Sequence, residues 1–226
     1  MGVVIPLILG LLPSFAWLAF YLLEDLRHPE PKRLIFYTFL AGAFITVFVL
    51  QFQILINNWL SSANIETYSS FAFVLFALVE EFFKFFAAFL VMKKSRDLDE
   101  PIDPMIYMIV SALGFSAVEN VASVFRSTDG LLGAGPIETT TLRFVGATLL
   151  HTLSSGVIGY YWGLSVARRM KFWRAIIGSL AIATLLHAIF NYFIIRFDEI
   201  TIPILFLVIV GFFILSDFEK LKKLEP

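Results

Sequence analysis

Two adjacent glutamates, Glu80 and Glu81, lie in a long apolar run and are followed by Lys84, in the stretch F-A-F-V-L-F-A-L-V-E-E-F-F-K-F-F-A-A-F-L-V. A charged side chain near the centre of a bilayer costs about 2.5–3.5 kcal/mol even on lenient insertion scales. Such residues normally face a protein interior or a wet cavity, and they mark functional sites. These three residues therefore indicate a site, and we expect other polar groups to face them.

Five further polar residues interrupt other apolar runs of the sequence. Glu119 and Asn120 lie in G-F-S-A-V-E-N, His151 in L-L-H-T-L-S-S-G, and His187 with Asn191 in L-L-H-A-I-F-N-Y. A desolvated carboxylate is a competent general base near neutral pH, and a histidine can share the proton transfer or hold a developing oxyanion. The combination predicts attack of an activated water on a carbonyl, in the first place on a peptide bond within the membrane.

The spacing of these residues indicates how they divide the work. Glu80 and Lys84 are four residues apart and share a helix face, which predicts a salt bridge between them. Glu81 is rotated by about 100° from Glu80, so the two carboxylates face different directions. We therefore expect Lys84 to hold one glutamate while the other faces the cavity and activates water. His187 and Asn191 also share a helix face. We therefore expect Asn191 to position the group on which His187 acts.

The composition indicates a polytopic membrane protein rather than a soluble domain. The 226 residues are 59% hydrophobic and only 15% charged, whereas a soluble domain carries about 25% charged residues. Helices satisfy their own backbone in lipid, so we predict one all-α membrane helix bundle over residues 1–226. There is no cysteine, which excludes disulfides and thiolate nucleophiles. The predicted spans are seven: 3–23, 34–56, 70–92, 104–125, 143–166, 174–196 and 201–216.

The basic residues predict the orientation of these spans. Only Arg126, Arg143 and Arg196 fall on one side of the membrane, and Lys84 lies within a span. The excess of basic residues on the other side marks the cytoplasm, which predicts an outside N-terminus and a cytoplasmic C-terminus. The residues on that side are thirteen: Arg27, Lys32, Arg33, Lys93, Lys94, Arg96, Arg168, Arg169, Lys171, Arg174, Lys220, Lys222 and Lys223.

The predicted depth brings the polar residues to one level. At a rise of 1.5 Å per residue, Glu80, Glu81, Glu119, His151 and His187 lie about 10–15 Å from the outer end of their spans. Four helices that run in opposite directions would thus contribute to one polar layer in the outer half of the membrane.

Other chemistries and other functions stay open. Ser154 and Ser155 lie within one turn of His151, which leaves a serine nucleophile open, and the sequence lacks the H-E-x-x-H zinc motif. The alternative to a protease is a proton-coupled transporter or channel, because Glu and His also relay protons within membranes. A non-catalytic scaffold would use the same residues as buried ion pairs and interhelical hydrogen bonds. We favour catalysis without a metal over a zinc site, whose ligands would come from His151, His187, Glu80, Glu81 and Glu119.

The chain resembles the PrsW family of bacterial intramembrane proteases, which is related to the CAAX prenyl endopeptidase and bacteriocin-processing group. The resemblance rests on an ordered set of motifs that covers most of the chain. It implies an endopeptidase of the bacterial cell membrane in which Glu80, Glu81 and His187 are essential. The residues themselves predict that His151 joins His187 in proton transfer or in holding the oxyanion. It also implies a partner, a single-pass anti-sigma factor cut on its extracytoplasmic side under envelope stress. The motifs are Y-L-L-E-D-L-R-H-P-E-P-K at 21–32, E-E-F-F-K at 80–84, G-F-S-A-V-E-N at 114–120, H-T-L-S-S-G-V-I-G-Y-Y-W-G at 151–163 and L-L-H-A-I-F-N-Y-F at 185–193.

Overall fold

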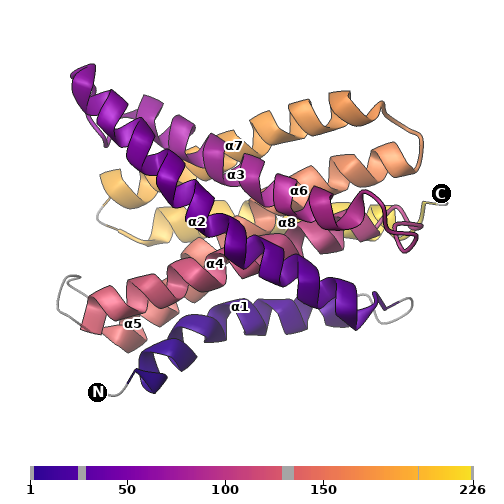
Figure 1. The fold of residues 1–226 in the computed structure, drawn as a ribbon, viewed down its shortest axis with the longest axis horizontal. Coiled ribbons are helices and arrows are strands. Elements are labelled where there is room, and N and C mark those ends of the chain that lie inside the picture. The colour runs from indigo at the N-terminus through magenta and orange to yellow at the C-terminus, as the bar shows by residue number, and fades with distance from the viewer. Residues whose placement is uncertain (1–2, 25–28, 129–134, 198, 225–226) are drawn as a thin grey trace.

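The protein is helical throughout the part that the structure, a computed structural model, describes: residues 3–24, 29–128, 135–197 and 199–224 (Figure 1). Arg27, one of the basic residues counted above, lies outside these ranges. The segments α5, η1 and α6 follow one another without a break, so the described chain forms seven helical rods, as predicted. The elements are α1 (Val4–Glu24), α2 (Lys32–Ser62), α3 (Ser70–Met92), α4 (Asp103–Thr128), α5 (Pro136–Leu142), the π-helical η1 (Arg143–Thr148), α6 (Leu149–Val166), α7 (Phe172–Arg196) and α8 (Thr201–Leu221).

Five of these helices, namely α1, α2, α4, α7 and α8, are long and apolar enough to cross a membrane. Helix α3 differs because Glu80, Glu81 and Lys84 all lie near its middle. Its passage through the membrane, and that of the rod containing α6, stays a prediction. The rod containing α6 also begins earlier than predicted, at Pro136 rather than at 143, because proline suits the first position of a helix.

Helix α4 is the central element of the bundle and packs against α1, α2 and α6 (Figure 1). Every residue from Asp103 to Ala117 is buried. Two glycines allow α2 to cross it closely: a Cβ at Gly42 would collide with the backbone of Ser111, and one at Gly114 with the backbone of Phe39. Small residues at helix crossings are the usual means of close packing in membranes. This crossing fixes α2 beside α3, and the polar residues of α2 therefore lie next to Glu80 of α3.

Consecutive rods run in opposite directions, so the chain ends lie at opposite ends of the bundle (Figure 1). The beginning of α1, the α2–α3 connection and the end of α7 share one end. The other end holds the start of α2, the end of α3 and the end of α8. Ser69 caps α3 at the first of these ends by accepting a hydrogen bond from the backbone of Ala72. The cap fixes where α3 starts, and the paired glutamates follow in its third turn.

Candidate active site

Glu81 is completely buried, and both of its carboxylate oxygens have hydrogen-bond donors. Its Oε1 accepts hydrogen bonds from Lys84 Nζ at 2.6 Å, His187 Nδ1 at 2.7 Å and Ser154 Oγ at 2.9 Å. Ser155 Oγ approaches Oε2 at 3.4 Å. A buried carboxylate needs such partners to remain ionised, and here α3, α6 and α7 supply them. Glu81 therefore ties three helices together.

The predicted salt bridge between Glu80 and Lys84 is wrong, because Lys84 pairs with Glu81 at a spacing of three residues. Spacings of three and four are both close on a helix. The interior decides between them: Lys84 Nζ also donates to His151 Nδ1 at 2.9 Å, on the side where Glu81 lies. Glu81 is therefore the glutamate that pairs with Lys84, and Glu80 is the one that lines the cavity.

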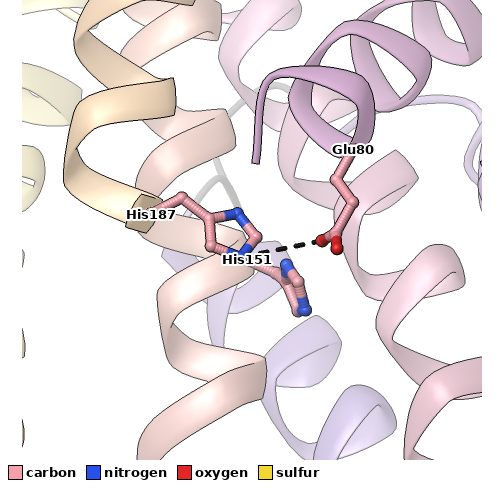
Figure 2. Close-up of side chains that lie close together, drawn as sticks. All are labelled: Glu80, His151 and His187. Atoms are coloured by element: carbon pink, nitrogen blue, oxygen red, sulfur yellow. Dashed lines mark ion pairs between the residues drawn. The ribbon is translucent and has the colours of Figure 1, made fainter. Parts of the chain in front are cut away.

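Glu80 lies on the next face of α3 and is only partly bonded. Its Oε1 accepts a hydrogen bond from Gln53 Nε2 of α2 at 2.8 Å. Its Oε2 is buried and has no hydrogen-bond partner among the described residues. His187 Nε2 lies 3.6 Å from this oxygen, and Figure 2 shows the two side chains facing each other. A neutral His187 that donates from Nδ1 to Glu81 carries a lone pair on Nε2, so two acceptors face one another.

His151 joins the cluster from α6 and is held by a second carboxylate. Its Nε2 donates to Glu119 Oε2 at 2.9 Å, and Arg143 Nη2 donates to the same oxygen at 3.2 Å. Arg143 Nε also donates to Asn120 Oδ1, and Asn120 Nδ2 donates to Thr148 Oγ1 at 3.0 Å. These contacts connect Glu119 to His151 directly and Asn120 to Glu119 through Arg143, and their orienting role stays a prediction.

Arg143 and Thr148 are the first and last residues of η1, the π-helical turn between α5 and α6. Such turns free backbone groups and re-aim side chains, and they are frequent at functional sites. The carbonyl of Phe144 in this turn accepts a hydrogen bond from Trp17 Nε1 of α1 at 3.0 Å. The local irregularity is therefore anchored, and it directs Arg143 toward Glu119.

A cavity of about 470 Å³ lies next to Glu80. Glu80 and Asn191 line it, whereas Glu81, Lys84 and His151 do not. Asn191 thus shares a space with Glu80 without a hydrogen bond to it. The lining residues are Gln53, Ile54, Asn57, Thr67, Tyr68, Phe73, Phe76, Glu80, Asn191, Ile194 and Ile195.

Glu80, His151 and His187 form a group that could hold a metal ion, with one ligand atom of each within 4.8 Å of the others (Figure 2). Each histidine uses its other ring nitrogen to bind a carboxylate, Glu81 or Glu119, which is the arrangement that orients metal-binding histidines. The unpaired Glu80 Oε2 faces His187 Nε2, as two ligands of one cation do. The ring nitrogen that His151 would offer, Nδ1, is bonded to Lys84 Nζ, so Lys84 would have to give up this bond and keep the one to Glu81. Under that condition the three side chains would fit a single divalent cation.

Comparison with known proteins relates the chain to a described enzyme family. The sequence profile of a family described as PrsW family intramembrane metalloprotease matches residues 30–216. The chain belongs to the PrsW family. Its relatives named Protease PrsW include one from Oceanobacillus iheyensis, 29% identical over 85% of this chain and 84% of the relative. Those from Geobacillus kaustophilus and Bacillus subtilis are each 26% identical over 81% of this chain, and over 76% and 79% of their own length. No solved structure matches the chain.

Membership of the PrsW family makes this chain a peptidase and a membrane protein. The family is described as a metalloprotease, which favours the metal alternative over the metal-free catalysis that we preferred from the sequence.

The site also contains residues whose contacts in it were not predicted from the sequence. Gln53 was visible as a polar residue in an apolar run, yet its partner on another helix was not. Arg143 was counted as a residue at a membrane edge, because the helix that contains it was predicted to start there. Ser154 and Ser155 were considered as nucleophiles, whereas their hydroxyl groups donate to Glu81.

Proposed function

We propose that the protein is an intramembrane endopeptidase in which Glu80 is the carboxylate that engages the reacting water. One observation carries this proposal: Glu80 has a buried oxygen without a hydrogen bond and also lines the cavity, whereas Glu81 has neither property. A carboxylate oxygen without a hydrogen bond, beside a space for substrate, is ready to accept a proton. Glu81 is already bonded on both oxygens and serves to position its neighbours.

The chain's own residues have distinct tasks in hydrolysis. Glu80 Oε2 accepts a proton from the water as the water attacks the substrate carbonyl, and it returns the proton to the leaving amine. His187 holds the same water through Nε2, because Glu81 fixes its Nδ1 as the donor. His151, fixed by Glu119 and Lys84, completes the polar wall. Asn191 lines the cavity from the next turn of α7 and can donate to the carbonyl oxygen.

Glu80, His151 and His187 would also hold the metal of a metalloprotease, and Glu80 Oε2 would then bind the ion instead of accepting the proton of the water. A divalent cation such as zinc, when bound there, supplies Lewis-acid polarisation of the water or of the scissile carbonyl.

We place the site in the outer half of the membrane, with the N-terminus outside and the C-terminus in the cytoplasm of a bacterial cell. The excess of basic residues at one end of the bundle supports this orientation. The cavity is lined partly by Thr67 and Tyr68 of the α2–α3 connection, at the end that holds the N-terminus. A cut there would fall in the extracytoplasmic juxtamembrane part of a single-pass protein. In keeping with the family resemblance, we propose an anti-sigma factor as that substrate.

Proteoliposomes that contain a pool of single-span peptides test this function. The juxtamembrane residues of each peptide are randomised, and mass spectrometry identifies the cleaved bonds. We expect the wild-type protein to cut bonds in the outer half of the span and the Glu80→Gln variant to cut them about 10²- to 10⁴-fold more slowly. Equal cleavage by both proteins would refute the proposed mechanism. Cleavage confined to the cytoplasmic side would refute the orientation.

A further inference from the structure

Three amide side chains line the cavity beside Glu80. Gln53 and Asn57 are four residues apart on one face of α2, and Asn191 lies on α7. Gln53 donates to Glu80, and Asn57 Oδ1 accepts a hydrogen bond from Thr67 Oγ1 at 2.9 Å. Among the described residues, the Asn57 side-chain nitrogen and the whole Asn191 amide have no hydrogen-bond partner. The cavity thus presents free amide donors and acceptors next to the proposed reacting group.

The rest of the cavity wall is mostly apolar, apart from Thr67 and Tyr68. Phe73 and Phe76 come from α3, and Ile194 and Ile195 come from α7. Apart from Glu80 the lining carries no charged residue. A ligand that fits this cavity is therefore neutral, with apolar side chains and with hydrogen-bonding groups of both kinds.

The helices around the cavity allow such a ligand to arrive from the side. Helices α2 and α7 both pack closely against α3 but have little contact with each other. The cavity lies where all three helices contribute residues, between α2 and α7. On α2, Asn57 faces this space while its neighbour Asn58 is exposed on the outer surface of the bundle.

We infer that this cavity binds an extended, neutral segment of the substrate next to the scissile bond, with Asn57 holding the substrate main chain. The inference rests on the proposed function and names a part of its substrate site. A helix must unwind before its peptide bond can be cut, and each unpaired backbone group in an apolar setting costs free energy. Amide side chains can donate to a carbonyl and accept from an N–H, so they match both freed groups. The phenylalanine and isoleucine walls select an apolar side chain beside the cleaved bond.

The adjacent residues Asn57 and Asn58 provide a matched pair of variants. In the peptide-pool assay, we expect Asn57→Leu to raise KM about three- to ten-fold, the range for loss of one net hydrogen bond, and to change kcat less than about twofold. Asn58→Leu should leave both constants unchanged. Thr67→Val, which removes only the bond to Asn57 Oδ1, should change KM less than Asn57→Leu does. Equal effects of Asn57→Leu and Asn58→Leu would overturn the inference, as would cleavage sites without a preference for apolar residues.

The absence of cysteine from the sequence allows a second test that does not depend on activity. A single-span peptide with one cysteine in its juxtamembrane segment is incubated, under oxidation, with Asn57→Cys or Asn58→Cys, each in the Glu80→Gln background. We expect a disulfide with Asn57→Cys and none with Asn58→Cys. Equal cross-linking at both positions would overturn the subsite. Cleavage of the peptide by the Glu80→Gln protein at the wild-type rate would instead refute the proposed function, so the two failures are distinguishable.

Discussion

The two sides of α3 hold the same type of side chain in opposite states. On the side of α6, Glu81 accepts hydrogen bonds from Lys84, His187 and Ser154 and does not reach the cavity. On the side of α2, Glu80 has one donor, Gln53, and one unpaired oxygen that faces His187. The residues are neighbours in sequence, and the rotation of about 100° between them accounts for the difference. A fully bonded carboxylate organises a site, while a partly bonded one can react in it.

His187 links the two sides, because its Nδ1 contacts Glu81 and its Nε2 faces Glu80. Glu81 thereby fixes the orientation of the His187 ring, whose other nitrogen faces Glu80. Variants that separate these two contributions can break or sharpen the comparison.

The largest effect is expected for Glu80→Gln. Loss of a general base costs about 10²- to 10⁴-fold in rate, so cleavage should fall by that factor. The thermal unfolding midpoint should not fall, because only one hydrogen bond, to Gln53, is altered. The Glu138→Gln variant, at an exposed residue in the first turn of α5, serves as the control and should match the wild type in both measurements. If the Glu80→Gln protein cleaved at the wild-type rate, Glu80 would not be the reacting carboxylate and the contrast with Glu81 would be refuted.

The next largest effect is expected on the stability of the protein, for a variant of Glu81. Glu81→Gln leaves the Lys84 ammonium buried without a counter-charge, which costs about 3–5 kcal/mol. The free energy of unfolding should fall by this amount, and adding Lys84→Met should restore most of it. If the double variant were as unstable as the single one, the ion pair would not explain the role of Glu81.

Metal removal should affect the Glu80 side alone. We expect a chelator to lower cleavage by the wild-type protein about a hundredfold, through loss of the Lewis acid, and added zinc to restore it. Elemental analysis should find one metal ion in the wild-type protein and less in Glu80→Gln. Full activity of a protein shown to be metal-free would leave Glu80 as a base that acts without a cation.

A smaller effect is expected for Arg143→Met, which removes a donor from Glu119 and so loosens His151. Partners that orient such histidines typically contribute about 10- to 100-fold, and we expect about tenfold here because Lys84 also holds His151. Arg143→Lys should recover part of the loss in cleavage rate. Arg126, a basic residue in the last turn of α4, offers a matched control as Arg126→Met.

The smallest effect is expected for Ser154→Ala, which removes one of the donors to Glu81. One hydrogen bond to a charged group is worth about 1.5–3 kcal/mol, and the other donors to Glu81 should reduce the observed loss of stability to about 1 kcal/mol. Cleavage should persist in Ser154→Ala and in Ser155→Ala. Complete loss of cleavage in either variant, with folding intact, would revive the serine nucleophile.

The helices and most of the site were predictable because membrane segments follow simple physical rules. Long apolar runs give helices, and the cost of burying Glu80, Glu81, Glu119, His151 and His187 marks them for function. Five of the seven predicted spans are long and apolar enough to cross a membrane. The charges on α3 that keep it from meeting this description are the same ones that revealed the site.

What failed were choices that depend on neighbouring helices. A spacing of four residues favoured Glu80 for Lys84, but the position of His151 decided for Glu81. Gln53 gains its role only from the crossing of α2 and α4. The π-helical turn at Arg143 has no local pattern that would predict it, since tertiary contacts such as that of Trp17 stabilise it.

The most direct measurement compares the cleavage rates of Glu80→Gln and of Glu81→Gln combined with Lys84→Met, in the same proteoliposomes and with the same peptide pool. In the double variant the amide oxygen introduced by Glu81→Gln can still accept a hydrogen bond from His187. We therefore predict that the double variant cleaves at least about ten times faster than Glu80→Gln, which lacks its general base. A double variant that is inactive although folded, beside a Glu80→Gln protein that cleaves, would contradict the assignment of Glu80 as the reacting carboxylate.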